Sequence, residues 1–219
     1  MVLSFFRQSA SPMDDVENRV HQMLVDGHAV YEVAMGAVFG GGKSKETKQE
    51  VKSTDHDINV AQRDVRRALI MHVSVAPSTD VAAVLTYMSV IKDVERIGDY
   101  AKNLYDLARY GVDFESASDH DELATYRDAV GQLLVDAAET FRTGDTEHAE
   151  ALIAKANGFL DDYDAHVKAA YRSDWSAEDA VARALYFRFL KRITAHVMNF
   201  LTSLVLPLDQ LDYYDEPRD

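Results

Sequence analysis

Two acidic side chains one helical turn apart, Glu95 and Asp99, are the residues of this sequence best placed for chemistry. At 100° per residue they share a face that is rotated away from the apolar stripe beginning at Val90 and Val94, so we expect both to point outward. Two carboxylates at this spacing repel each other by roughly 0.2–0.5 kcal/mol in an isolated helix, and a cation between them would relieve the repulsion. The pair is therefore a candidate cation site.

A second pair of oxygen-bearing side chains, Asp55 and Asn59, has the same spacing in an earlier helical segment. If the two helices pack side by side, four such side chains converge: Asp55, Asn59, Glu95 and Asp99. Carboxylate and amide oxygens suit hard cations, so Mg, Ca, Mn and Fe are the expected occupants and Zn a less suitable one. These four residues are the predicted metal ligands, and no catalytic residue is predicted.

Basic residues on the same helix offer a simpler interpretation of the acidic face. Three of them can neutralise the carboxylates by i,i+3 and i,i+4 pairing without a metal: Lys92, Arg96 and Lys102. Spacing alone leaves the metal site and the neutralised face both open. A further group on the first helical segment is interpreted as solvated surface, because mixed acidic and imidazole side chains are usual there: Glu17, His21, His28 and Glu32.

Composition excludes several functional classes. The chain has no cysteine, which rules out disulfides, thiolate zinc sites and thiol nucleophiles. A formal charge of −14 opposes binding to nucleic acid and to anionic lipid, so cations and basic protein surfaces are the expected partners. No glutamate is followed by histidine three residues later, as a ferritin-like di-iron oxidase requires, and Gly40–Lys43 lacks the spacing of a phosphate-binding loop. We expect a protein that is not an enzyme.

Long segments with helical apolar spacing, interrupted by only 10 glycines and 4 prolines, predict an all-α fold of six helices. Caps and breakers place the first three helices at about 12–40, 43–76 and 79–111. We interpret these three helices as one up-down-up bundle.

Three further helices follow a linker at residues 112–121. Asp119 and Glu122 have the form of a capping box that opens the fourth helix, which closes at Gly144. Asp145 caps the fifth helix, and the sixth runs from just after Ser176 to about residue 206.

One apolar stripe occurs twice in the chain. In the third helix it consists of Val90, Val94, Ile97, Ala101, Leu104 and Ala108, and 96 positions later it consists of Tyr186, Leu190, Ile193, Val197, Phe200 and Leu204. Arg96 and Asn103 recur at the same offset as Arg192 and Asn199. The repeat predicts two tandem three-helix bundles, residues 12–111 and residues 119–214.

No targeting or membrane-spanning segment is expected. The apolar run within Met1–Arg7 is too short for a signal peptide, and its basic residue follows the run. The most apolar stretch, Phe200–Leu208, falls far short of the roughly 18 apolar residues that a spanning helix needs. We expect a soluble, cytoplasmic protein that can associate peripherally with a membrane protein.

The run Asp93–Leu104, which reads Asp-Val-Glu-Arg-Ile-Gly-Asp-Tyr-Ala-Lys-Asn-Leu, resembles the signature of the PhoU family. That signature is Glu-Arg-Ile-Gly-Asp followed by an aromatic residue or His and then Asn. The Pro77–Asp80 turn and the Asp55-x-x-Ile58-Asn59 pattern are also similar to the family. The resemblance extends over nearly the whole chain as a tandem repeat.

The resemblance implies paired three-helix bundles that hold metal ions or clusters on acidic pairs of their second and third helices. The first bundle keeps the acids of this pattern, with Asn59 where an acid is common. In the second bundle Lys191 and Ala195 replace both acids of the signature, and the fifth helix offers Asn157 and Asp161. Replacing carboxylates by an ammonium and a methyl group inverts the charge, so we predict no metal in the second bundle.

Members of the PhoU family act as negative regulators of phosphate uptake that couple a phosphate ABC transporter to a sensor histidine kinase. The resemblance therefore implies a homodimeric signalling adaptor with those two partners and no activity of its own. Three alternatives stay open: a protein that binds or stores Fe, Mn or Mg, an accessory protein of another transporter, and a helical scaffold.

Overall fold

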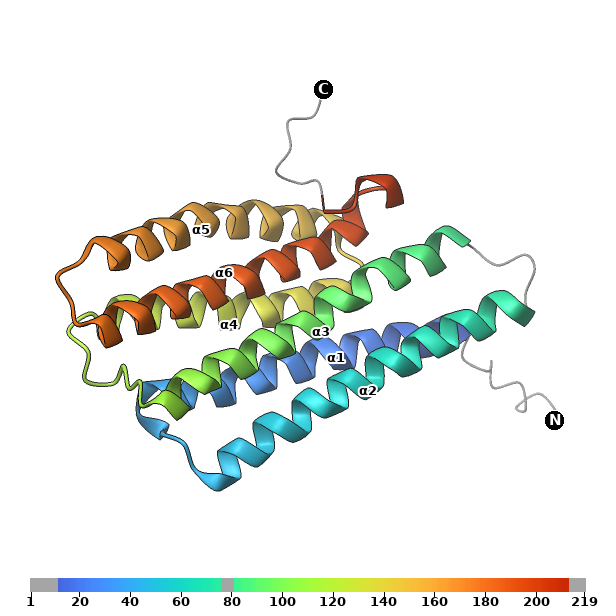
Figure 1. The fold of residues 1–219 in the computed structure, drawn as a ribbon. Helices are drawn as coiled ribbons and strands as arrows, with labels where there is room; N and C mark the ends of the chain where they lie inside the picture. The colour runs from blue at the N-terminus through green and yellow to red at the C-terminus, as the bar shows by residue number, and fades with distance from the viewer. Residues whose placement is uncertain (1–11, 76–80, 213–219) are drawn as a thin grey trace, which may run out of the picture.

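The computed structural model describes residues 12–75 and 81–212, which form six long helices and two short helical turns (Figure 1). In chain order these are α1 (Pro12–Gly36), the π-helical turn η1 (Ala37–Gly41), α2 (Lys45–Val75), α3 (Val81–Tyr110), α4 (His120–Thr143), α5 (Thr146–Arg172), α6 (Ala177–Val205) and the 3-10 turn η2 (Leu208–Gln210). The described residues contain no strand, and the predicted all-α class is confirmed.

The first helix ends earlier than predicted. α1 stops at Gly36, and η1 continues the chain to Gly41. Gly40 (φ 90°) and Gly42 (φ 68°) adopt the left-handed conformation that glycine accepts without steric cost, which lets the chain turn back into α2. The boundaries predicted at residues 76–79 lie outside the described residues.

Predicted caps at two helices are confirmed and a third is wrong. Asp145 accepts a hydrogen bond from the backbone N–H of residue 148 at the start of α5 (2.9 Å), and Ser176 accepts one from the N–H of Asp179 at the start of α6 (3.1 Å). Asp119 precedes α4 but makes no side-chain cap hydrogen bond, so the capping box is wrong there. Its carboxylate is bound by Arg183 of α6 instead.

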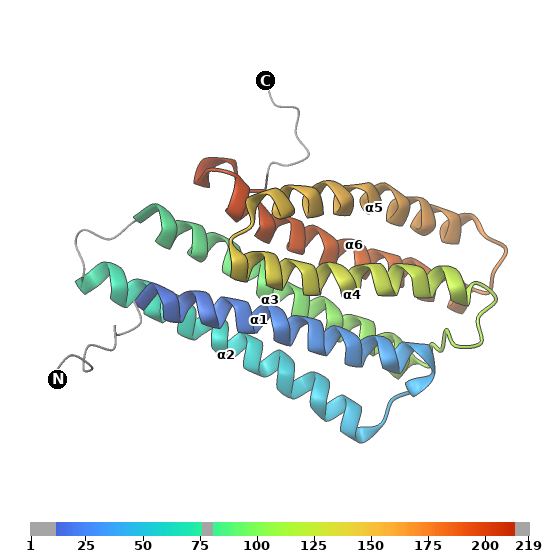
Figure 2. The same ribbon diagram turned by 180° about the vertical axis from the view of Figure 1, so that it is seen from behind.

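The helices form two groups of three that meet along a central seam. α1, α2 and α3 pack on one another and form the first unit, and α4, α5 and α6 form the second unit. The units meet where α1 lies against α4 and α3 lies against α6 (Figures 1 and 2). The division of the chain into two bundle domains, residues 12–111 and 119–214, stays a prediction.

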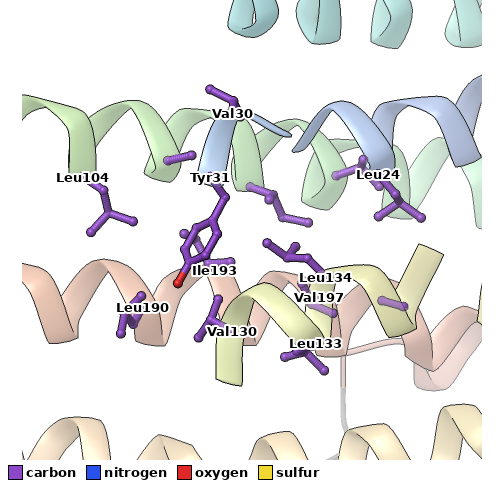
Figure 3. Close-up of a cluster of buried hydrophobic side chains, with 14 of the residues drawn as sticks. Leu24, Val30, Tyr31, Leu104, Val130, Leu133, Leu134, Leu190, Ile193 and Val197 are labelled. Carbon is purple, nitrogen blue, oxygen red and sulfur yellow. The ribbon is translucent and has the colours of Figure 1, made fainter. Parts of the chain in front are cut away.

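One apolar core runs through both units. The whole predicted stripe of α3 is buried, and the stripe of α6 is buried except for Leu204, which is partly exposed. In Figure 3 side chains of α1, α3, α4 and α6 meet in one cluster, among them Tyr31, Leu104, Val130 and Ile193. Each large apolar side chain buried in this way contributes about 1.5–3 kcal/mol, so the seam joins the units firmly.

Candidate functional site

The packing of α2 against α3 brings the two predicted pairs together. Gly98, inside the Glu95–Asp99 pair, faces Ile58, inside the Asp55–Asn59 pair: a Cβ atom at Gly98 would lie 3.0 Å from Cδ1 of Ile58. The helices approach this closely because Gly98 has no side chain. The three carboxylates of the two pairs therefore lie, partly buried, on one surface, which we call the acidic face (Asp55, Glu95 and Asp99).

A lysine of α3 holds two carboxylates of the acidic face. Nζ of Lys102 donates hydrogen bonds to Oδ1 of Asp55 at 2.8 Å and to Oδ1 of Asp99 at 3.2 Å. Burial alone lowers the pKa of Lys102, but the hydrogen bonds to both carboxylates outweigh this effect and raise the pKa above its ordinary value. Lys102 is therefore charged at neutral pH and links α2 to α3.

Arg96 supplies a second cation. Its Nη1 donates to Oδ2 of Asp99 at 2.9 Å, and its Nε lies 3.7 Å from Oε2 of Glu95. Burial, followed by repulsion from Asp99, raises the pKa of Glu95, and the charge of Arg96 opposes this rise. Neutralisation of the acids by Arg96 and Lys102 is confirmed, while Lys92 is exposed elsewhere on α3.

The acidic face does not fit a metal ion as it stands. Asn59, the fourth predicted ligand, donates from Nδ2 to the backbone carbonyl of Asp55 at 2.8 Å, so its amide turns back on its own helix. Asp55 and Asp99 already bind cationic side chains. Within residues 12–75 and 81–212, no group of three or more His, Asp or Glu side chains is arranged to hold a metal ion. Metal binding by the four predicted ligands stays a prediction.

Comparison with known protein families identifies one domain within the chain. The model of the PhoU domain matches residues 31–108, which contain α2, almost all of α3 and the whole acidic face. Residues 31–108 are therefore a PhoU domain. No curated protein matches it in sequence.

Two solved PhoU structures share the fold along nearly the whole chain. The phosphate transport system regulatory protein PhoU from Streptococcus pneumoniae matches with a TM-score of 0.75 at 17% identity, over 94% of this chain and 96% of that chain. PhoU from Pseudomonas aeruginosa matches with a TM-score of 0.75 at 18% identity, over 89% of this chain and 95% of that chain. At such identities these matches show that the six-helix arrangement is the PhoU fold.

The membrane prediction can be compared with the helices directly. None of the helices in the described part of the chain is both long enough and apolar enough to cross a membrane.

The second unit carries a different arrangement on the surface equivalent to the acidic face. Lys191 and Ala195 of α6 stand where the PhoU signature of α3 has its two acids, and Lys191 forms an ion pair with Asp164 of α5. Asn157 and Asp161, the residues predicted from the fifth helix, are exposed. The prediction that no metal binds here stays a prediction.

A buried polar link joins the two units, and none of its residues was a predicted site residue. Oδ1 of Asp93 accepts hydrogen bonds from Nδ1 of His196 (2.8 Å) and from Nδ2 of Asn199 (3.2 Å), both on α6. Its Oδ2 is buried and has no hydrogen-bond partner among the described residues. One signal pointed to Asp93, because it follows Val90 by three residues and so interrupts the apolar stripe, where a carboxylate needs partners.

A second unpredicted link fixes the end of the molecule where α4 begins. Arg183 donates from Nε and Nη2 to the two carboxylate oxygens of Asp119, at 2.7 and 2.6 Å. These hydrogen bonds hold the pKa of Asp119 below its ordinary value. The guanidinium carbon lies 4.7 Å from the centroid of the Trp175 ring, so Trp175, which is about half exposed, packs on Arg183.

The group of residues interpreted as solvated surface on α1 makes ordinary surface contacts. Glu17 accepts a hydrogen bond from the Tyr87 hydroxyl at 3.2 Å, and His28 lies 3.5 Å from the carboxylate of Glu32. These contacts are consistent with the surface interpretation.

Proposed function

We propose that this protein is a non-enzymatic regulator of phosphate uptake of the PhoU family, which acts in the cytoplasm as an adaptor between a phosphate ABC transporter and a sensor histidine kinase. The observation that carries the proposal is the PhoU domain at residues 31–108, with Glu95 and Asp99 of its signature in place on α3. The fold of a phosphate transport system regulatory protein along 94% of the chain supports it. A homodimer is part of this proposal.

The outer helices provide surfaces on which such partners can dock. α2 exposes Glu50 and Asp57, and α5 exposes Asp161 and Asp162. α2 and α5 lie at opposite edges of the molecule (Figures 1 and 2). Acidic side chains on a chain of net charge −14 steer basic partner surfaces toward it, so each edge can receive a different partner.

Binding to two purified partners tests the adaptor role. We expect the protein to bind the ATPase subunit of a phosphate transporter, the cytoplasmic part of the kinase, or both, with an affinity that falls as salt rises. Two charge-reversal variants serve as matched controls for each other, because each changes the charge by the same amount at one edge: Glu50→Lys with Asp57→Lys, and Asp161→Lys with Asp162→Lys. Binding of neither partner by the folded wild-type protein would remove the proposed function.

A further inference from the structure

The acidic face of the first unit contains a cation of its own. Nζ of Lys102 lies within hydrogen-bond distance of Oδ1 of both Asp55 and Asp99. A divalent ion held by these two carboxylates needs their oxygen atoms at about 2.0–2.6 Å, on the side where the ammonium lies. One carboxylate oxygen cannot serve both cations at full strength, and two positive charges this close repel each other.

The charge of the acidic face is already balanced. Its three carboxylates face Lys102 and Arg96 at ion-pair distances, and the charge of Arg66 on α2 also acts on Glu95. Sites that bind Mg or Mn through carboxylates depend on negative charge that the protein leaves uncompensated. The acidic face leaves little negative charge uncompensated.

We propose that Lys102 is the resident counter-ion of the acidic face and excludes divalent cations from it by competition. The ammonium is on a flexible four-carbon stem and its side chain is 35% exposed, so it can move into solvent. An ion therefore binds Asp55 and Asp99 only in molecules from which the ammonium has left. Lys102 thus sets the cation preference of a surface whose acids alone would favour a metal.

Manganese binding to the full chain tests this proposal. Isothermal titration calorimetry with MnCl₂ is carried out on the wild type, on Lys102→Met and on Lys92→Met. The Lys92 variant removes one positive charge from an exposed position on the same helix. We expect Lys102→Met to bind Mn at least tenfold more tightly than the wild type, and Lys92→Met to match the wild type. Adding Asp55→Asn and Asp99→Asn to Lys102→Met should abolish the gain.

Three outcomes would overturn the proposal. Equal Mn affinity in the wild type and in Lys102→Met would show that the ammonium does not compete. An equal gain in Lys92→Met would show a general charge effect. A gain that survives Asp55→Asn and Asp99→Asn would place the ion elsewhere. Circular dichroism checks the fold of each variant, and Lys102→Gln, also neutral and of similar length, replaces a methionine variant that fails to fold.

Discussion

The outer surfaces of the two units occupy equivalent positions but distribute their charges differently. On the first unit, Lys102 of α3 bridges to Asp55 of α2. On the second unit Lys191 of α6, at the position equivalent to Glu95, pairs with Asp164 of α5. In both units an ion pair links the third helix to the outer helix. The comparison teaches that both halves link these helices by an ion pair but build it from different positions: Lys191 reverses the charge of Glu95, whereas the position equivalent to Lys102 is the neutral Met198.

The two units also differ near the starts of α3 and α6, and a variant there should have the largest effect on stability. Tyr87 and Arg183 are equivalent positions, and each bonds to an acid in or just before the first helix of its own unit: Glu17 and Asp119. We expect Asp119→Ala to lower the free energy of unfolding by about 3 kcal/mol, because it removes both short hydrogen bonds from a guanidinium that is only 9% exposed and leaves it the longer contact with Asp179 at 3.5 Å. Urea denaturation measures the loss.

Tyr87→Phe is the matched control for that variant. It removes one hydrogen bond to an exposed acid, so we expect a loss of about 0.5–1.5 kcal/mol. Equal losses in Tyr87→Phe and Asp119→Ala would contradict the view that the second unit depends on a buried ion pair.

The same ion pair predicts how stability depends on pH. Since Arg183 lowers the pKa of Asp119 in the folded protein, the contribution of this carboxylate is fully present above its ordinary pKa of about 3.9 and is lost as the pH falls through the lower folded pKa. The difference in unfolding free energy between wild type and Asp119→Asn should therefore shrink in strongly acidic solution. A difference that stays constant from pH 7 to pH 2 would contradict this account.

The seam between α3 and α6 allows a test of intermediate size. The position equivalent to Asp93 is Phe189, and Phe189 packs near Tyr100, the equivalent of His196. The seam is therefore polar on one side and aromatic on the other. We expect His196→Phe to cost about 1–3 kcal/mol in urea denaturation, because it removes a hydrogen bond from a buried carboxylate.

A double variant separates that hydrogen bond from packing. Asp93→Leu combined with His196→Phe removes both partners, and replacing both by apolar groups is close to neutral when the shapes are accommodated. We expect it to recover most of the stability lost in His196→Phe. A double variant less stable than the single one would show that the carboxylate contributes through contacts other than His196.

A smaller effect on stability is expected when a residue at the α2–α3 contact is replaced by its equivalent from the α5–α6 contact. Gly98 corresponds to Thr194, which is buried beside Tyr163 in the second unit. Gly98→Thr should cost about 1–2 kcal/mol in urea denaturation, because it adds a hydroxyl and a methyl group to a Cβ that already lies 3.0 Å from Cδ1 of Ile58. Gly98→Ala should be near neutral, since the gain of about 1 kcal/mol in helix propensity offsets a milder contact. A neutral Gly98→Thr would show that α2 can move away freely.

The ion pair of the second unit should have the smallest effect. Asp164 is more than half exposed, so Lys191→Met should change the unfolding free energy by only about 0–1 kcal/mol. The measurement is urea denaturation at low and high salt, where the small difference should disappear as salt rises. A loss of more than 2 kcal/mol of unfolding free energy would show that this ion pair stabilises the fold more than an exposed pair is expected to.

The fold was largely predictable because apolar spacing is a local property of the sequence. The repeated stripe of α3 and α6 placed the core, and the side-chain caps at Asp145 and Ser176 fixed two helix starts. The cap at Asp119 failed for a reason that local sequence does not contain. A nearby backbone N–H and the guanidinium of Arg183, which is 64 positions away, compete for the Asp119 carboxylate. The carboxylate binds the guanidinium, because that contact consists of two charge-assisted hydrogen bonds.

The candidate site was predictable in its residues and not in its balance of charges. The spacing of the acids and the Gly98–Ile58 contact bring the predicted pairs together, as the packing of two helices at this register requires. Lys102 satisfies an acid on its own helix and another on α2, and only the second contact distinguishes a bridge from an ordinary i,i+3 pair. Contacts of this kind depend on how two helices are rotated, which the pattern of one helix does not define.

The carboxylate of Asp93, which has no counterpart on α6, fixes the register of α3 against α6. α3 and α6 carry apolar residues at the same spacing, so a slip of one turn, about 5.4 Å, would still bring apolar side chains together. Such a slip would take Asp93 away from His196 and Asn199 and leave a buried charge without donors. Asp93 also disfavours pairing of α3 with the α3 of another copy. In such a pair, Tyr100 would take the place of the His196 imidazole that donates to Asp93. At the seam, Asp93 thereby distinguishes α3 from α6.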